Sequence, residues 1–319
     1  MTLPLLNRYQ LKKNPYDRRE LDPLNKPKDL DLLARVDSFK KLDEVDKILQ
    51  ESVDNQRPAY FVVTGRNGSG RSTVANYIVA RYCELRGIEP ERFVIPDREV
   101  PNHDEISLFR SWMLNLHFRI KRYGINVGRD VLDELNTTPK QNFDDNAILV
   151  QTFLELAWNV GNALKGVNAG YGVFFENVPT YSLIETGKKI FKEAETVCVF
   201  TTLSYESLRV DIPTSEPNNP DILVELNPIK GQDVKVVTEK YWPLPRINHP
   251  FDPDGQGIEE SFQVSNPIAR VLRVLADLLE DKVKEHPEGP PWPEDRTLAY
   301  TTDELLQKVP DALNKRWRQ

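Results

Sequence analysis

The stretch Ala59-Tyr-Phe-Val-Val-Thr-Gly-Arg-Asn-Gly-Ser-Gly-Arg-Ser-Thr73 decides how this chain folds. It opens with an apolar run that ends at a glycine, which is typical of a buried parallel strand. From Arg71 to Arg86 apolar side chains recur at helical spacing, and Gly87 stands where a helix would end. The sequence therefore predicts a strand that passes through a glycine-rich connection, Gly65–Thr73, directly into a helix.

The connection has the spacing of the phosphate-binding pattern G-x-x-x-x-G-K-[ST]. Its glycines allow successive amide N–H groups to turn inward, and the helix N-terminus adds a partial positive charge. We expect it to hold a triphosphate, with Ser72 binding Mg²⁺ and Arg71 reaching the outer phosphates. The expected nucleotide-binding residues are Gly65, Arg66, Asn67, Gly68, Ser69, Gly70, Arg71, Ser72 and Thr73. A glycine-rich turn with a purely structural role is the alternative interpretation.

Arg71 departs from the pattern, which has lysine at that place. A guanidinium keeps the charge of an ammonium group but is planar and bulkier, so it does not keep the geometry. We therefore expect nucleotide binding to survive this replacement and hydrolysis to be impaired.

A second polar strand end follows later in the chain, where an apolar run precedes Glu176 and Asn177. A carboxylate at such a place holds the water shell of Mg²⁺, and an acidic residue after it polarises the attacking water. Glu176 is then the metal-side residue, and Asn177 replaces the general base. An asparagine can position a water but cannot accept its proton. Thr201 or Thr202, at the end of another predicted strand, could contact the γ-phosphate. Solvated polar strand ends are the alternative.

The remaining pattern predicts a doubly wound α/β core followed by helices. The further predicted strands are 92–95, 171–177, 196–202 and 222–226, and the further predicted helices are 36–53, 104–122, 147–164, 232–241, 258–262, 268–283 and 302–317. Prolines interrupt the N-terminal residues, and strands cease after Pro228. We expect an extended segment over 1–35, a nucleotide-binding core over 36–230, a helical lid over 231–286 and a tail with one helix over 287–319.

Composition narrows the function classes. The net charge is −7, from 42 basic and 49 acidic residues, so charge alone disfavours binding to nucleic acid. No apolar run reaches the roughly 18 residues of a membrane-spanning helix, and no membrane partner is expected. Two cysteines cannot form a disulfide framework or a metal cluster, which makes a reducing cytoplasm the expected location. The four histidines show no metal-ligand spacing.

On these residues the chain resembles the AAA+ and STAND group of P-loop NTPases, particularly its initiator-like branch. The resemblance covers about residues 35–284 and rests on Gly65–Thr73, Phe174–Asn177, the Thr201-Thr202 strand end and the helices after Pro228. It implies an α/β fold with five parallel strands in the order 5-1-4-3-2, an all-helical lid, and ATP with Mg²⁺ as the ligand. The preference for adenine over guanine comes from the resemblance alone.

The resemblance also implies roles for arginines outside the glycine-rich connection. Arg270, with Arg273 as the alternate, matches a lid arginine that senses the γ-phosphate, and a solvated arginine is the alternative interpretation. Arg209 lies where such proteins often carry an arginine that acts on a neighbouring subunit.

These observations lead us to expect an ATP-binding conformational switch or assembly module. Its ATP hydrolysis should be slow or absent, because the lysine and the general base are both replaced. Assembly with other protein subunits or with copies of itself is expected from the resemblance. An initiator-like or loader-like ATPase that binds nucleic acid and a scaffold that no longer binds nucleotide are the alternatives.

Overall fold

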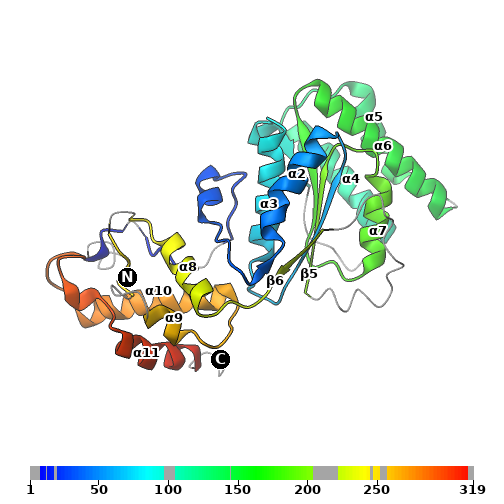
Figure 1. Cartoon of the computed structure of the whole chain (residues 1–319). Coiled ribbons are helices and arrows are strands. Elements are labelled where there is room, and N and C mark those ends of the chain that lie inside the picture. Colours follow the sequence, from blue (N-terminus) through cyan, green and yellow to red (C-terminus); the bar gives the residue numbers. More distant parts are fainter. Residues whose placement is uncertain are drawn as a thin grey trace.

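The structure is a computed structural model that describes residues 8–11, 13–17, 20–96, 105–143, 145–203, 222–244, 247–251 and 257–314. It has two lobes, an α/β core and a helical module, which Figure 1 shows side by side. The short 3-10 helix η1 (Pro27–Leu32) lies between them. None of the described helices has the length and apolar character needed to cross a membrane.

The core is built on a six-stranded sheet in the order β1-β6-β2-β5-β4-β3. Neighbouring strands are parallel except β1, which runs antiparallel to β6. The strands are β1 (Phe39–Lys40), β2 (Ala59–Thr64), β3 (Phe93–Val94), β4 (Gly170–Phe175), β5 (Val197–Thr202) and β6 (Ile222–Leu226).

The predicted α/β core with a parallel sheet is confirmed, but the predicted number of strands is wrong. The five parallel strands lie in the order β6-β2-β5-β4-β3, and β1 adds a sixth at the edge. The sequence had predicted a helix over 36–53, because apolar residues recur there at helical spacing. Lys41 adopts the left-handed conformation with φ of 62°, which no helix continues through, and α2 (Val45–Asp54) begins only after it.

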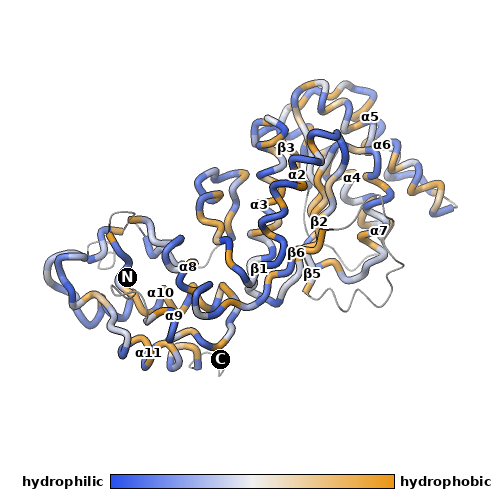
Figure 2. The backbone as a smooth tube through the Cα atoms, viewed as in Figure 1, coloured by the Kyte–Doolittle hydropathy of each residue, from blue (hydrophilic) through white to orange (hydrophobic). Residues whose placement is uncertain are grey.

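Helices cover both faces of the sheet (Figure 1). Along β2 the side chains alternate between the two layers: Phe61 and Val63 pack with α2 and α3 (Arg71–Leu85), whereas Tyr60 and Val62 belong to the opposite cluster. That opposite layer consists of α4 (Glu105–Arg122), α5 (Arg129–Thr137), α6 (Asn146–Gly166) and α7 (Tyr181–Ile190). Figure 2 shows the apolar strands enclosed between them. The sequence had not predicted α5 or α7.

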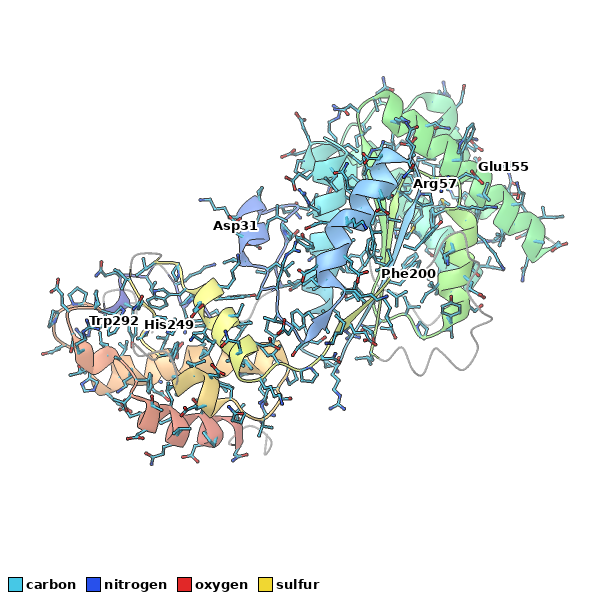
Figure 3. All side chains as sticks on the ribbon, viewed as in Figure 1. Asp31, Arg57, Glu155, Phe200, His249 and Trp292 are labelled. Atoms are coloured by element: carbon cyan, nitrogen blue, oxygen red, sulfur yellow. The ribbon has the colours of Figure 1, made fainter. Side chains whose placement is uncertain are left out.

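The helical module contains α8 (Gln232–Tyr241), α9 (Gly257–Ser261), α10 (Ile268–Glu285) and α11 (Thr302–Asn314). Two tyrosines of the N-terminal segment are buried in it. The Tyr9 hydroxyl donates to the Leu298 carbonyl at 3.0 Å, and the Tyr16 hydroxyl donates to the Thr238 carbonyl of α8 at 3.0 Å. Trp292 is also buried, and Figure 3 shows it beside His249 at the outer end of the module. The N-terminal segment is therefore anchored in the module before it crosses to the core.

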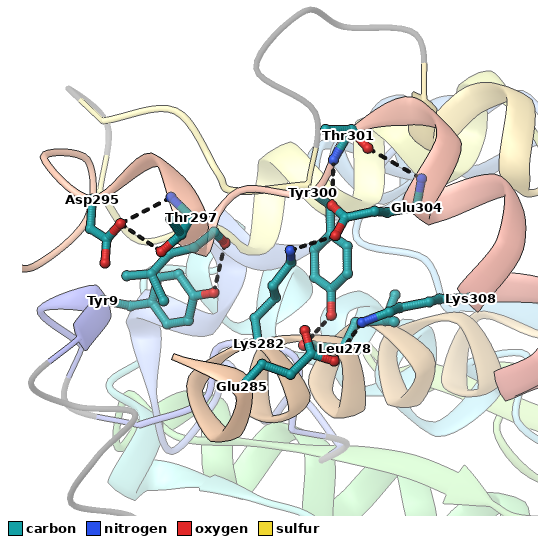
Figure 4. Close-up of polar contacts among 11 residues, drawn as sticks. Tyr9, Leu278, Lys282, Glu285, Asp295, Thr297, Tyr300, Thr301, Glu304 and Lys308 are labelled. Carbon is teal, nitrogen blue, oxygen red and sulfur yellow. Dashed lines mark hydrogen bonds and ion pairs between the residues drawn. The ribbon is translucent and has the colours of Figure 1, made fainter. Parts of the chain in front are cut away.

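A buried lysine of α10 fixes α11 in place (Figure 4). Lys282 is 4% exposed, and its Nζ lies 2.8 Å from Glu304 Oε1 and 4.7 Å from the centre of the Tyr300 ring. The other Glu304 oxygen accepts from the Thr301 N–H at 2.9 Å. Partial burial acts to raise the pKa of Glu304, but the bonds from Lys282 and Thr301 and the charges of Lys282 and Lys308 lower it below its ordinary value.

Replacing Lys282 should destabilise the module in a pH-dependent way. Because the folded pKa of Glu304 is depressed, its stabilisation is present above the unfolded value of about 4.3 and is lost as the pH falls through the lower folded value. We expect Lys282→Met to lower the free energy of unfolding by about 1–3 kcal/mol at pH 7. The loss should shrink in acid when urea denaturation is followed at both pH values.

Lys308→Met is the matched control, because Lys308 pairs with Glu285 at a more exposed place. This variant should lower the free energy of unfolding by only about 0–1 kcal/mol. Equal losses for the two variants at every pH would contradict the role given to Lys282.

Candidate functional site

The connection between β2 and α3 is a tight backbone turn that excludes side chains at Gly65. A Cβ built there would lie 2.4 Å from Ser69 Oγ and 2.8 Å from the Leu226 carbonyl oxygen of β6. Gly68 and Gly70 have φ of +80° and +95°, which L side chains rarely adopt. The Gly65 N–H donates to the Thr202 carbonyl at 3.4 Å, so the turn is held against the ends of both neighbouring strands.

Two buried polar atoms of the turn have no hydrogen-bond partner among the described residues. They are Ser69 Oγ, in a side chain that is 3% exposed, and Arg71 Nη1. The other terminal nitrogen of Arg71 donates to Asn67 Oδ1 at 3.3 Å. Burial lowers the pKa of Arg71, and the charge of Glu176 opposes the shift. A buried donor without a partner costs about 1–3 kcal/mol, so both atoms are suited to an anionic ligand.

A cavity of about 500 Å³ opens over this turn. Its polar side is formed by the turn and the first residues of α3, and its apolar side comes from the N-terminal segment, from β1 and from the helical module. The lining residues are Glu20, Leu33, Ala34, Phe39, Asn67, Gly68, Ser69, Gly70, Arg71, Ser72, Thr73, Val74, Tyr241, Ile268, Ala269 and Leu272. This volume is within the range of small-molecule sites, about 300–1,000 Å³.

The helical module touches the turn directly. The Ala269 N–H, in the first turn of α10, donates to the Gly68 carbonyl at 3.0 Å. A Cβ at Gly68 would lie 3.2 Å from the Ala269 Cβ, which is a tight contact. The N-terminal ends of α3 and α10 therefore converge on one cavity, and both contribute positive potential there.

The structure places most of the predicted binding residues at this cavity. Asn67 to Thr73 line it, and Gly65 shapes the turn behind them. Arg66 is exposed and is not among the lining residues. The Thr73 hydroxyl accepts a hydrogen bond from the Leu21 N–H at 3.3 Å, which ties the N-terminal segment to α3.

The other predicted site residues lie at strand ends beside the turn. Glu176 directly follows β4 and is half-buried, and its charge acts on Arg71. Asn177 is exposed with φ of 54°, and its N–H donates to Thr201 Oγ1 at 3.0 Å. Thr202 is buried at the end of β5. None of Glu176, Asn177 and Thr202 is among the described residues that line the cavity.

Arg270 lies on α10, where its guanidinium donates to the carbonyl of Leu313 near the end of α11. The residues that α10 contributes to the cavity wall are Ile268, Ala269 and Leu272. Arg209 lies outside the described residues.

Sequence reasoning missed the residues that complete the cavity, among them Glu20, Phe39 and Tyr241. They come from three segments that are distant in the chain, and no local motif marks any of them. Among the described residues, no group of three or more His, Cys, Asp or Glu side chains is arranged to hold a metal ion.

No protein-family model and no curated protein matches the sequence. Among solved structures, the Orc1 protein of Aeropyrum pernix in complex with DNA is similar at 13% identity and a TM-score of 0.47, with 92% of this chain and 69% of that one covered. Drosophila ORC bound to DNA gives 10% identity, a TM-score of 0.47, and 96% and 68% coverage. C. elegans PCH-2 is similar at 12% identity and a TM-score of 0.37, with 87% of this chain and 68% of that one covered. Values this low assign neither a family nor an activity to the chain.

The contact between Gly68 and α10 can be tested with two glycine variants. Gly68→Ala and Gly87→Ala both place a side chain at positive φ, but only at position 68 does the new Cβ meet another residue. We expect each variant to lose about 1–2 kcal/mol of stability. Only Gly68→Ala should also speed hydrogen exchange at the Ala269 N–H, because it displaces the start of α10. Equal exchange at Ala269 in both variants would contradict this docking contact.

Proposed function

We propose that this chain binds ATP with Mg²⁺ and acts as a nucleotide-dependent conformational switch or assembly module of the AAA+/STAND type. The observation that carries the proposal is a pair of buried polar atoms, Ser69 Oγ and Arg71 Nη1, that have no hydrogen-bond partner among the described residues. Both residues line a cavity of about 500 Å³ at a helix N-terminus. A triphosphate supplies the hydrogen-bond acceptors that these donors lack.

The turn residues would hold the phosphates. Amide groups between Asn67 and Ser72 and the positive end of α3 favour the negative charge, and Arg71 balances the outer phosphates. The Ser72 hydroxyl would bind Mg²⁺, and Glu176 would hold the water shell of the ion. The bound ion would offset charge on the phosphate oxygens.

The apolar side of the cavity suits a nucleobase. Leu33 and Ala34 come from the N-terminal segment, Phe39 comes from β1, and Tyr241 and Leu272 come from the helical module. A nucleotide in this place would contact both lobes at once. Since a ligand favours the arrangement that it binds better, ATP would stabilise the docked position of the module and so set the surface offered to partner subunits.

Hydrolysis should be slow. Arg71 replaces the usual lysine, and Asn177 cannot accept a proton from the attacking water. We further propose that Thr202 contacts the γ-phosphate and that Arg270 senses it after releasing the Leu313 carbonyl, the bond it makes in this structure. Phosphate release should stay well below the roughly 10 s⁻¹ of an average enzyme, and an ordinary ATPase rate would contradict these assignments.

Calorimetric titration with ATP and Mg²⁺ tests the binding. We expect saturable binding by the full chain and an affinity about 10- to 100-fold lower in Arg71→Ala, because charged hydrogen bonds to the phosphates are lost. Arg81→Ala is the control: Arg81 is also an α3 arginine, but it pairs with Asp46 and Glu84 away from this cavity. Binding should be unchanged there. If ATP gave the unmodified chain no heat of binding and no shift of its melting temperature, the result would instead support a scaffold that no longer binds nucleotide.

A further inference from the structure

The cavity contains one charged group that phosphate binding does not use. Among the described residues that line it, Glu20 is the only carboxylate. It belongs to the N-terminal segment, where the chain crosses from the helical module to the core. Glu20 is an exposed residue, and a carboxylate in the wall of a site that otherwise suits an anion repels phosphate.

Glu20 is held in the cavity wall by contacts to α3. Asn76, which is 3% exposed, donates through its Nδ2 both to Glu20 Oε1 and to the Leu21 carbonyl, the latter at 2.8 Å. The Leu21 N–H in turn donates to Thr73 Oγ1 at 3.3 Å. Three hydrogen bonds thus fix two consecutive residues of the N-terminal segment on the first turns of α3. The position of the carboxylate beside Thr73 follows from this anchoring.

The chemistry of a carboxylate limits what it can bind. An ionised carboxylate only accepts hydrogen bonds, and phosphate oxygens do the same, so a ligand can add to the bond from Asn76 only through a donor such as a hydroxyl or an amino group. A nucleotide offers the two hydroxyls of its ribose and, in adenine, an amino group. Glu20 lies next to Thr73 in the first turn of α3, because the Leu21 N–H bonds to Thr73 Oγ1. The apolar wall of Leu33 and Phe39 forms another part of the same cavity. In any nucleotide the sugar lies between the phosphates and the base.

We propose that Glu20 accepts hydrogen bonds from the ribose hydroxyls and makes this site selective for ribonucleotides. The inference rests on the proposed nucleotide binding and adds a specificity residue to it. It also gives the N-terminal segment a direct contact with the ligand, so that ribose binding draws residues 20–21 onto α3 more firmly.

The test compares ATP with 2′,3′-dideoxyATP, both with Mg²⁺, in calorimetric titrations of the full chain. Because Glu20 is exposed, water can partly replace a missing hydroxyl, so the unmodified chain should bind ATP about two- to tenfold more tightly. In Glu20→Ala the ratio of the affinity for ATP to the affinity for 2′,3′-dideoxyATP should fall close to one, mainly because ATP binds more weakly. Glu20→Gln, which keeps the shape of the side chain, should give an intermediate ratio.

Asp31→Asn is the matched control, since Asp31 is an acidic residue that lines the neighbouring cavity instead, in the region between the lobes shown in Figure 3. In this variant the ratio of the affinities for ATP and 2′,3′-dideoxyATP should equal that of the unmodified chain.

Several outcomes would overturn the inference. A ratio near one in the unmodified chain would do so, and so would an equal change in both affinities in Glu20→Ala, which would indicate charge repulsion or contact with the base. Loss of the Mg²⁺ dependence in Glu20→Gln would make Glu20 a metal ligand. If the unmodified chain bound neither nucleotide, the proposed function would fail as well, and this result is distinct from the others.

Discussion

The structure around the cavity depends on close backbone approaches at two glycines. At Gly65 a side chain would collide with Ser69 and with the Leu226 carbonyl, so the turn can lie against the end of β6 only because position 65 has no Cβ. At Gly68 the carbonyl accepts the Ala269 N–H, and the first turn of α10 packs on the same residue. These contacts bring two helix N-termini to one place, where Ser69 Oγ and Arg71 Nη1 have no hydrogen-bond partner in the part of the chain that the structure describes.

The cavity is formed by three separate segments, so a ligand bound in it would contact both lobes. The N-terminal segment is anchored in the helical module through Tyr9 and Tyr16 and then bonds to α3 through Leu21. The helical module contacts the core through the Ala269 N–H, which donates to the Gly68 carbonyl. A ligand in this position would touch both connections, and it would favour the arrangement of the lobes that it binds better. The pair formed by the buried Lys282 and the partly buried Glu304 holds α11 against α10.

The sequence predicted best those elements whose structure depends on residues that are neighbours in the chain. The strand Ala59–Thr64, the turn after it and the helix from Arg71 were predicted nearly to the residue, because an apolar run, glycines and a 3.6-residue period lie in one continuous stretch. The edge strand at Phe39 was mistaken for helix, since its two residues carry no alternation and its antiparallel partner β6 is far away in the chain. The cavity wall at Glu20, Leu33 and Tyr241 was missed for a similar reason: only tertiary packing brings these residues to the turn. The bond from Arg270 to Leu313 was equally invisible in the sequence.

The decisive measurement for nucleotide binding at this cavity is a crystal structure of the full chain crystallised with Mg²⁺ and a non-hydrolysable ATP analogue. We expect triphosphate density within hydrogen-bond distance of Ser69 Oγ and Arg71 Nη1, with the base against Leu33 and Phe39 and with the Ala269 N–H still on the Gly68 carbonyl. Electron density that leaves this cavity empty, or that shows the nucleotide bound elsewhere on the molecule, would contradict nucleotide binding at this site.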